Sequence, residues 1–453
     1  MHDYNKPDPA LEHSKYADLN SRAVSDEAKA FIEQLASLVE DQEIASGLRS
    51  NRRRAANKVR EHRQALGAFV GDLLAAGTKI KAAGWCHRSL KAETFTRERV
   101  SYRTFVDMLA ALKDLGYVEH REGQQRLRKF GPKEYIALKG MASRFRATSA
   151  FLRLAKEAGI YKDTISHHFI EDLPQHPLVL KASSKRIAGQ KAEGKAMRIT
   201  HTQKSLALEE EVRRLNKFLD GFDIRGAVHK GYRRIFNQGD VKGFDWDRGG
   251  RLYGGDESYQ RQSKDVRLKM TINDSSVVEI DISASYLTLL HGLQGLPFDP
   301  MSRDPYEVEG VKRAVVKAWT TATLGNQGHL RRWPKDTVKD FEEETGYRLP
   351  DIISVTRLRA IMEERHPVFL DWEKSRITWA DLMFHESQAV VGAMLELMDR
   401  GLPSLCVHDS LLVRIEDQDK ALKVLVKRYE AVSKIKPRVK INTLTSSPLN
   451  GSQ

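Results

Sequence analysis

VVEIDISASYLTLL, residues 277–290, passes from the residue spacing of a β-strand to that of an α-helix. Apolar side chains first alternate, at Val278, Ile280 and Ile282, and then recur at helical spacing, at Tyr286, Leu289 and Leu290. This change of period predicts a strand that runs directly into a helix. Asp281 lies on the other face of the strand, at its end. A carboxylate at such a junction is well placed to bind a metal ion, because the strand fixes the backbone and the turn leaves the oxygens accessible.

A partner strand is predicted just upstream. In RLKMTIND, residues 267–274, apolar side chains alternate at Leu268, Met270 and Ile272. Asn273 and Asp274 supply a turn, since both residue types tolerate turn conformations. The two segments together predict a β-hairpin that ends near Asp281.

A second acidic turn lies in SLCVHDSLLVRI, residues 404–415. His408 and Asp409 interrupt two short apolar strands, which predicts a tight hairpin with Asp409 at its tip. Because a buried carboxylate without a partner costs too much free energy, the turn has to present Asp409 to water or to a cation. Taken alone, an aspartate in a hairpin turn is more often simply a turn former.

Two further segments carry cations. Arg313 and Lys317 are four residues apart, so both lie on one face of a predicted helix. Two aligned cations suit a triphosphate, and surface charge for solubility is the alternative. Upstream, in residues 248–270, two Gly-Gly pairs flank Arg251, Leu252 and Tyr253. Glycine permits close approach of the backbone, and Arg251 is long enough to reach a phosphate.

Composition favours a polyanionic partner. The chain of 453 residues has a formal net charge of +14 and a pI near 9.5, which points to nucleic acid, with a basic enzyme that lacks such a partner as the alternative. The two cysteines, Cys86 and Cys406, lack the spacing of a zinc site or a disulfide framework. No stretch resembles a signal peptide or a membrane span, so we expect a cytoplasmic protein.

The first 205 residues divide into three predicted parts: a disordered tail at 1–25, a helical and winged-helix-like nucleic-acid-binding region at 26–180, and a basic linker at 181–205. Helical spacing runs from Ser25 to about Leu74. It contains a basic run with few acidic partners at helical spacing, formed by Arg49, Arg52, Arg53, Arg54, Lys58, Arg60 and Arg63. A phosphate-facing surface and a solvated helix face are both open for this run.

Residues 98–140 resemble a winged helix-turn-helix. Ser101 is a potential N-cap of a helix that runs to Leu115 and stops at Gly116. Two alternating segments around a polar, glycine-containing turn follow it and predict a basic hairpin. Such modules contact DNA in some proteins and other proteins elsewhere, and both roles stay open here.

Taken together and in this order, the C-terminal motifs resemble the palm and fingers of the DNA polymerase I family (family A) and of the phage-type single-subunit RNA polymerases. The resemblance covers roughly residues 230–420. Gly250-Arg251-Leu252 resembles the T-G-R-L segment, Asp281-Ile282-Ser283 the first catalytic motif, and His408-Asp409-Ser410 the second. Arg313 and Lys317 resemble the nucleotide-binding helix of the fingers, and residues 385–388 (HESQ) resemble the start of a helix that faces the template–primer terminus.

The resemblance implies an α+β fold, with a right-hand polymerase in residues 206–453 and a mostly helical, winged-helix-like N-terminal half. It also implies two-metal phosphoryl transfer, with two Mg²⁺ ions (or Mn²⁺) about 3.5–4 Å apart. Asp281, Asp409 and the carbonyl of Ile282 would be the metal ligands. Nucleotide binding is expected of Arg313, Lys317 and Tyr286, and primer or template binding of Arg251, Tyr253, Gln388 and His408. For His408 a purely structural role is the alternative.

The family pattern leaves the choice of nucleotide open. Tyr286 stands where the DNA-making members carry a glutamate that helps to exclude the ribose 2′-hydroxyl, and a bulky ring there favours deoxynucleotides. Ser410, in contrast, resembles the RNA polymerases. In the fingers helix Thr321 and Gly325 replace an expected aromatic residue and a tyrosine, so Trp319 and Leu324 are candidate substitutes for base stacking.

We therefore expect a DNA-directed DNA polymerase that uses a template–primer and nucleoside triphosphates. No block of spaced acidic residues suggests a proofreading exonuclease, which favours an accessory, plasmid, phage or repair-type replication enzyme. Two alternatives stay open: a small single-subunit RNA polymerase or primase, and a winged-helix DNA-binding initiator or regulator with an inactive palm.

Overall fold

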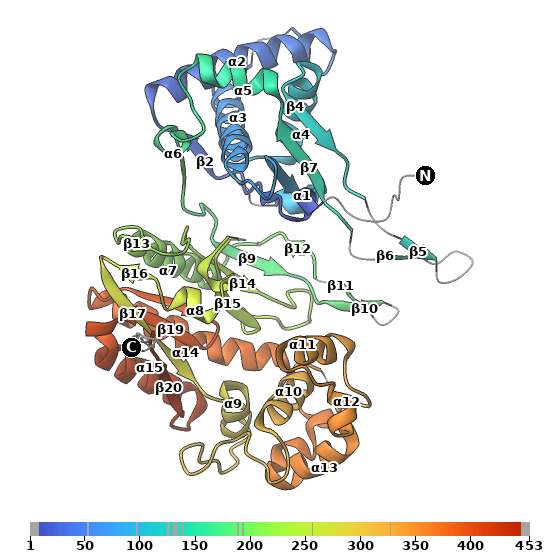
Figure 1. Cartoon of the computed structure of the whole chain (residues 1–453), viewed down its shortest axis with the longest axis vertical. Helices are drawn as coiled ribbons and strands as arrows, with labels where there is room; N and C mark the ends of the chain where they lie inside the picture. The colour runs from blue at the N-terminus through green and yellow to red at the C-terminus, as the bar shows by residue number, and fades with distance from the viewer. Residues whose placement is uncertain are drawn as a thin grey trace, which may run out of the picture. The chain divides into compact units, whose positions relative to one another are not determined.

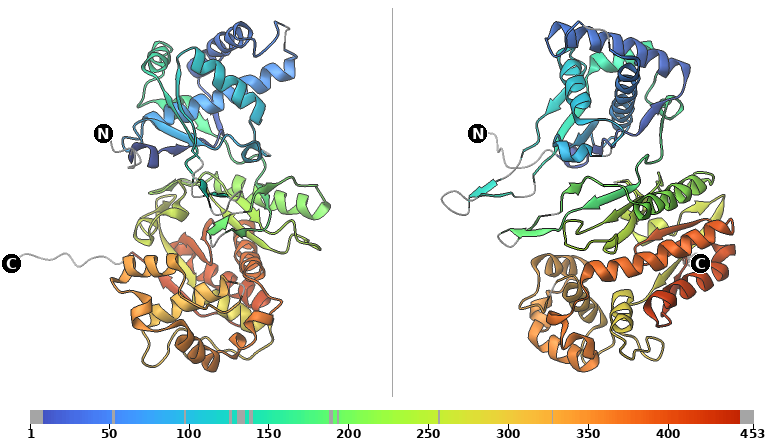
Figure 2. Two further views of the ribbon diagram at one scale, coloured as in Figure 1. Left: turned by 90° about the vertical axis from the view of Figure 1, so that its right-hand side faces the viewer. Right: turned by 180° about the vertical axis from the view of Figure 1, so that it is seen from behind.

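The computed structural model divides the chain into two compact units (Figures 1 and 2). Unit 1 comprises residues 1–176 and 184–200, and unit 2 comprises residues 177–183 and 201–453. The structure describes residues 9–444 except 52, 53, 97, 125, 126, 130–134, 138, 139, 188, 189, 193, 256 and 327. None of the described helices is both long enough and apolar enough to cross a membrane.

Three long helices and a four-stranded sheet form the core of unit 1. The helices are α2 (Asp26–Ala45), α3 (Ala56–Gly77) and α4 (Tyr102–Asp114). The sheet has the order β1-β3-β7-β4, with bounds Lys15–Tyr16, Trp85–Arg88, Ser143–Ala147 and Val118–Arg121. Phe69, Phe105 and Phe145 pack edge to face between the helices and the sheet, which joins α3, α4 and β7 in one apolar core.

Short elements complete unit 1. They are α1 (Pro9–Glu12), β2 (Ser21–Ala23), η1 (Ala92–Phe95), β5 (Leu127–Lys129), β6 (Tyr135–Ala137), α5 (Ser149–Glu157), α6 (Ile165–His168), β8 (Phe169–Glu171), β10 (Lys185–Ile187), β11 (Gln190–Ala192) and β12 (Ala196–Met197). The helix predicted after Ser101 is present, and the Ser101 hydroxyl accepts a hydrogen bond from the Thr104 amide as its N-cap. The hairpin β5–β6 lies between β4 and β7. Identification of this region as a winged helix stays a prediction.

The N-terminal segment differs from the expected disordered tail. Residues 1–8 lie outside the described residues, but residues 9–25 form α1, β1 and β2. Ala17 and Leu19 are fully buried, and the amide of Leu19 donates to the Asp72 carboxylate at 2.8 Å. Lys15 forms an ion pair with the same carboxylate at 3.1 Å. The polar composition of this segment hid these contacts, because the partner Asp72 lies far away in sequence.

The basic run is largely paired with acids. Arg49 and Arg54 both bind Glu40, and Arg63 binds Glu33 at 2.6 Å. These acids come from α2, whereas the run lies after it, so helical spacing within the run does not reveal them. Arg52 and Arg53 lie outside the described residues. The run is therefore in large part an interhelical ion-pair network.

Unit 2 is built on a six-stranded sheet with β17 (Ser275–Ile282) at its centre. The neighbours of β17 are β19 (Ser410–Arg414) on one side and β16 (Thr271–Ile272) followed by β20 (Val439–Asn442) on the other. The sheet is completed by β18 (Ser404–Val407) and β13 (Ile224–Arg225). Helices α9 (Ser285–Leu293), α14 (Trp379–Asp399) and α15 (Gln418–Ser433) pack together and against this sheet (Figure 1).

Two further groups of elements complete unit 2. A second sheet contains β9 (Leu178–Lys181), β14 (Arg233–Phe236) and β15 (Gly249–Tyr253), with α7 (Gln203–Leu219) packed on it. The helical part contains α10 (Arg313–Leu324), α11 (Lys335–Thr345), α12 (Leu349–Ile352) and α13 (Val355–Arg365). The short helical turns are η2 (Tyr259–Arg261), α8 (Lys264–Arg267), η3 (Pro367–Phe369), η4 (Trp372–Lys374) and η5 (Ile415–Asp417).

Both predicted hairpins of unit 2 are present. Asn273 and Asp274 have positive φ angles of 49° and 62°, which suits a two-residue turn between β16 and β17. His408 has φ 56° in the turn between β18 and β19. The first predicted strand is shorter than expected, because residues 264–267 form α8 and only Thr271–Ile272 pair with β17. The turn of α8 carries Arg267, which forms an ion pair with Glu279 of β17 at 2.9 Å.

The boundary between the units differs from the predicted linker at 181–205. Residues 177–183 belong to unit 2, residues 185–192 contain the hairpin β10–β11, and α7 begins at Gln203. More of this segment therefore forms helices and strands than its basic composition predicts.

Candidate functional site

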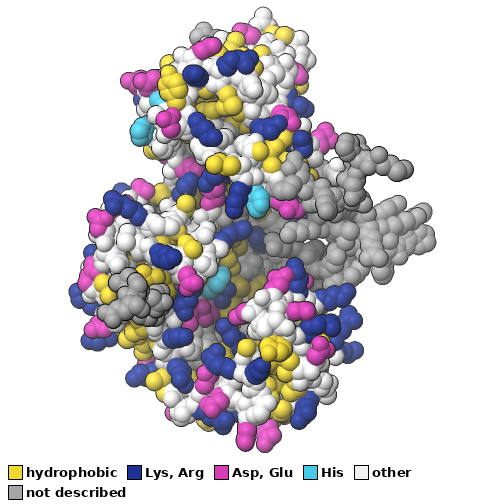
Figure 3. All heavy atoms as spheres, viewed as in Figure 1, with side chains coloured by type: hydrophobic (Ala, Val, Ile, Leu, Met, Phe, Trp, Pro, Cys, Tyr) yellow, Lys and Arg dark blue, Asp and Glu magenta, His cyan; other side chains and the backbone are white. Residues whose placement is uncertain are grey.

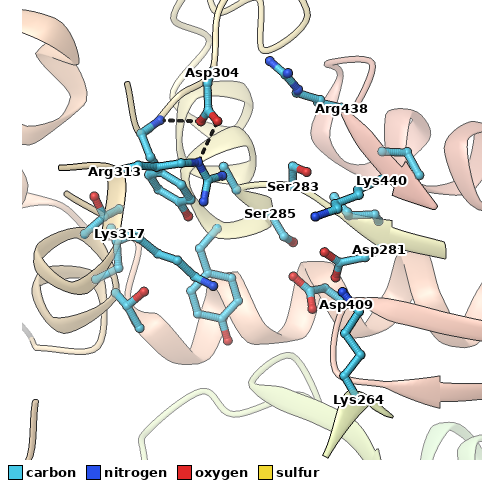
Figure 4. Close-up of a pocket in the computed structure, with 18 of the residues that line it drawn as sticks. Lys264, Asp281, Ser283, Ser285, Asp304, Arg313, Lys317, Asp409, Arg438 and Lys440 are labelled. Atoms are coloured by element: carbon cyan, nitrogen blue, oxygen red, sulfur yellow. Dashed lines mark hydrogen bonds and ion pairs between the residues drawn. The ribbon is translucent and has the colours of Figure 1, made fainter. Parts of the chain in front are cut away.

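The predicted carboxylates lie together in unit 2. Asp281 is the penultimate residue of β17, and Asp409 belongs to the two-residue turn between β18 and β19. Because β17 and β19 are antiparallel with Asp281 opposite Ser410, the turn lies at the end of β17. The Ile282 amide contacts the Asp409 carbonyl at 3.4 Å. Figure 4 shows both carboxylates directed into one pocket of about 790 Å³.

Asp281 is surrounded by charges of both signs. Burial and the neighbouring Glu279 raise its pKa, whereas Lys317, Lys264 and Lys440 oppose that rise. Glu279 is itself held by Arg267 at 2.9 Å and by the Ser410 hydroxyl at 3.1 Å. Glu279 is thus neutralised by its own neighbours, whereas the Asp281 carboxylate has no ion pair or side-chain hydrogen bond among the described residues and is available to a ligand in the pocket.

Among the residues that the structure describes, Asp409 has no ion-pair partner. Burial, Glu386 and Asp281 raise its pKa well above the ordinary value, and Arg251 only partly compensates. Two carboxylates about 4 Å apart repel by roughly 4 kcal/mol at an effective dielectric of 20. A divalent cation bound between two such carboxylates would convert this repulsion into attraction.

The donor set suits a magnesium ion that is shared with a substrate. Among the residues that the structure describes, no group of three or more His, Cys, Asp or Glu side chains is arranged to hold a metal. Mg²⁺ is usually bound through one or two carboxylates plus substrate phosphates and water, so a complete protein cage is not required. Asp281 and Asp409 fit this mode, and Ile282 lines the same pocket.

The two predicted fingers cations face the same pocket from α10. Arg313 and Lys317 are both exposed and line it. Arg313 is bound by Asp304 at 2.7 Å and lies over the ring of Tyr306, with its Cζ 5.2 Å from the ring centroid. Lys317 has no ion-pair partner among the described residues, so its ammonium group is available to an anionic ligand.

A buried ion pair lies beneath the pocket. Arg251 on β15 binds Glu386 on α14, a carboxylate that is 1% exposed and also accepts a hydrogen bond from Ser285 at 2.7 Å. Glu386 was expected only as a member of the HESQ segment, with no role of its own. Its signal was present, however, because Glu386 shares one helix face with Leu382 and Val390, and an acid on an apolar face requires a cation.

Tyr286 lies beside this ion pair. It is half-buried on α9, lines the pocket, and its ring centroid is 5.5 Å from the Cζ of Arg251. Burial and Glu386 raise the pKa of its hydroxyl, so the phenol stays neutral at physiological pH. The ring therefore lies at the edge of the site as a neutral group beside Arg251.

The residues predicted to bind primer or template do not all lie at the pocket. Arg251 lines the pocket, whereas Tyr253, Gln388 and His408 do not belong to its lining. Partial burial and the cations Arg251 and Arg267 lower the pKa of His408 to about 4, so its ring is neutral at pH 7. The HESQ segment lies within α14, which begins at Trp379 with Thr378 as its N-cap, and therefore does not start a helix as expected.

One suggested base-stacking substitute is wrong. Trp319 is fully buried and packs edge to face on Phe369, with ring centroids 5.1 Å apart. It serves the apolar core of unit 2 and cannot stack on a base. Leu324 is 1% exposed but borders the pocket, next to the exposed Thr321.

Five charged or aromatic residues of the pocket were not anticipated. They are Lys264, Asp304, Tyr306, Arg438 and Lys440. The segments that carry these residues are brought to the site by contacts with segments that are distant in the sequence. Lys264, for example, donates to Asn442 of β20 at 2.7 Å.

No family model and no curated protein sequence matches this chain. Among solved structures, the POL domain of Pol1 from M. smegmatis, in complex with a DNA primer-template and dNTP, aligns with a TM-score of 0.29 and 12% identity. The alignment covers 95% of this chain and 67% of that chain. A TM-score this low carries no argument, so the function is inferred from the residues of the site itself.

Proposed function

We propose that the chain is a metal-dependent, DNA-directed DNA polymerase that extends a primer on a template. One observation carries the proposal. Two carboxylates from adjacent strand ends, Asp281 and Asp409, share a pocket with Arg313 and Lys317 of a single helix. Phosphoryl transfer needs paired carboxylates that can bind a metal ion. It also needs basic side chains on the opposite side of the site that can bind the phosphates.

Each group has a distinct role in this proposal. Asp281 and Asp409 hold the metal, with the Ile282 carbonyl as a further ligand. Bound Mg²⁺ would neutralise phosphate charge and favour ionisation of the attacking 3′-hydroxyl. Lys317 and Arg313 bind the triphosphate and stabilise the charge that develops on the leaving pyrophosphate. For Arg313 this requires release from Asp304, an exposed contact that a more highly charged phosphate group can replace.

Tyr286 is the proposed selector of the sugar. Its ring is fixed beside the Arg251–Glu386 ion pair, where a bulky group would collide with a ribose 2′-hydroxyl. Deoxynucleotides would therefore be preferred. The same ion pair keeps Arg251 in place for a primer or template contact, and His408, in the turn between β18 and β19, would contact the primer end.

For unit 1 we propose a winged-helix contact with DNA. The exposed side chains of α4 include Arg103 and Lys113, which suit a phosphate backbone. Replacing both by glutamine would weaken duplex binding, measured by fluorescence anisotropy. Unchanged affinity would leave a protein contact or a packing role for this region.

The test of the proposed function is extension of a labelled primer on templates of defined sequence. We expect incorporation to follow the template, to require Mg²⁺ or Mn²⁺, and to stop on chelation. Parallel reactions with dNTPs and with NTPs separate a DNA polymerase from an RNA polymerase or primase. Absence of extension with either nucleotide set would refute the proposal.

A further inference from the structure

Strand β20 and the residue that precedes it bring two basic side chains to the pocket, Lys440 and Arg438. In the antiparallel pair of β20 and β17, Lys440 stands opposite Asp281. The Ser283 amide donates a hydrogen bond to the Arg438 carbonyl at 2.8 Å, which fixes the start of the strand. Because directly opposed residues of an antiparallel pair project from the same face, Lys440 lies beside Asp281, as Figure 4 shows.

The pocket contains more cations than its acids can neutralise. Its lining includes six basic side chains (Arg251, Lys264, Arg313, Lys317, Arg438 and Lys440) and three carboxylates (Asp281, Asp304 and Asp409), an excess of three positive charges. Three of the cations are occupied: Arg251 by Glu386, Lys264 by Asn442 and Arg313 by Asp304. Among the described residues, Lys317, Arg438 and Lys440 have no such partner.

The unoccupied cations lie on two opposite sides of the pocket. Lys317 extends from α10, whereas Lys440 extends from β20 and Arg438 from the residue just before it. The carboxylates of Asp281 and Asp409 lie on the same side as β20 (Figure 4). Lys440 is exposed and Arg438 is half-buried. An anion between the two sides would therefore contact both groups of cations and the metal-binding acids.

A purely structural role does not account for Lys440. Its charge favours ionised Asp281, but the two side chains form no ion pair, although the register places them opposite each other. The ammonium group is directed into the pocket instead of closing on the nearest carboxylate. Such a group is available to a ligand that carries several negative charges.

We propose that Arg438 and Lys440 bind the β- and γ-phosphates of the incoming nucleoside triphosphate, opposite Arg313 and Lys317. This inference rests on the proposed function and adds a second phosphate-binding wall to it. The same two residues would hold the pyrophosphate that leaves after transfer. They are positioning residues, since the bond is broken at the α-phosphate.

The test compares Lys440→Gln, Arg438→Gln and the double variant with wild type and with Lys436→Gln. Lys436 is an exposed basic residue of the same segment that does not line the pocket, so it serves as the matched control. We expect each site variant to raise the KM for the nucleotide about tenfold, as for the loss of one charge-assisted contact, and the Kd for primer–template to stay unchanged. Inhibition by added pyrophosphate should weaken in parallel.

A KM equal to that of Lys436→Gln would overturn the inference, and so would a weaker Kd for primer–template with an unchanged KM, because the cations would then contact the duplex. A binding measurement without turnover separates this inference from the proposed function. With Ca²⁺ and a fluorescent nucleoside triphosphate, Lys440→Gln and Arg438→Gln should weaken binding, whereas binding of the matching monophosphate should not change. If wild type binds triphosphate in this way but extends no primer, only the proposed function fails.

Discussion

Asp409 illustrates how a residue gains its role from its surroundings. In sequence it is a turn aspartate after a histidine, a pattern that is common in hairpins. In the fold its carboxylate faces Asp281, with Glu386 nearby and no cation bound to it alone. The strand register that creates this arrangement also places Lys440 beside Asp281. The pair was predictable from motif order, but its electrostatic setting was not.

The raised pKa of Asp409 has a consequence for stability. A carboxyl whose pKa is higher in the folded than in the unfolded protein binds protons more tightly when folded, so the metal-free protein loses stability as pH rises above about 4, the ordinary pKa. Asp409→Asn removes this loss of stability at higher pH, because asparagine does not ionise. In EDTA the variant should have a Tm about 2–4 °C above wild type at pH 8, which corresponds to about 1 kcal/mol, and a smaller difference at pH 5.

Thermal unfolding at both pH values checks this prediction, with the exposed Asp340→Asn as a control. A lower Tm for Asp409→Asn at both pH values would mean that the carboxylate serves the fold and not a bound cation. Added Mg²⁺ should raise the Tm of wild type more than that of Asp409→Asn, because ligand binding stabilises the state that binds it.

Tyr286 is the residue at which nucleotide choice is tested. Tyr286→Ala should increase incorporation of ribonucleotides relative to deoxynucleotides by roughly tenfold or more, because a steric obstacle to the 2′-hydroxyl is removed. The measurement is the ratio of kcat/KM for NTP and dNTP in primer extension. Tyr347→Ala, exposed and outside the pocket lining, is the control. A Tyr286→Ala variant that gains no use of NTPs rules out this role.

At the scale of elements, local sequence signals were sufficient for the parts nearest the chemistry. The turn at Asn273-Asp274, the hairpin at His408-Asp409 and the helix that carries Arg313 and Lys317 all form as expected. These features depend on turn chemistry and helical spacing within a few residues. β20 and the Arg251–Glu386 pair were missed because each depends on contact between segments more than a hundred residues apart.

Close packing of α9 against α15 gives a test of the fold that positions Asp281. A Cβ on Gly292 would lie 1.7 Å from the carbonyl oxygen of Ser433, which is a backbone atom. Gly292→Ala should therefore destabilise unit 2 by about 1–3 kcal/mol, the usual cost of overpacking. In contrast, a Cβ on Gly392 of α14 would meet only the side chain of Arg428 at 3.7 Å.

Gly392→Ala is the matched control and should raise stability by about 0.5–1 kcal/mol, as expected for alanine in a helix interior. Denaturant unfolding of both variants measures the difference. Equal stabilities would show that α9 does not approach α15 as closely as the structure places it.

At the scale of the whole molecule, the chain has a formal net charge of +14. In the face shown in Figure 3, Lys and Arg side chains are interspersed with Asp and Glu over unit 2 and do not form one continuous basic patch. Net charge therefore indicated the class of partner, but it did not indicate where that partner binds. The pocket, with its excess of cations, is the better indicator.

Binding of nucleic acid should depend strongly on salt. Contacts to several phosphates release counterions, so the affinity for a primer–template should fall at least tenfold between 50 and 200 mM salt. The measurement is fluorescence anisotropy across this range. An affinity that does not change with salt would contradict a phosphate-binding surface. The basic residues would then serve solubility and not nucleic-acid binding.

The central claim is that Asp281 and Asp409 act together in metal-dependent nucleotidyl transfer. The most direct measurement is the rate of single-nucleotide addition to a primer in Mg²⁺, compared for wild type, Asp281→Asn, Asp409→Asn and the control Asp340→Asn. We predict that each site variant loses at least about a thousandfold in rate, that the control is unchanged, and that primer–template affinity stays within about twofold, since loss of a catalytic group acts on the transition state. Activity of either site variant at the wild-type rate would contradict the account.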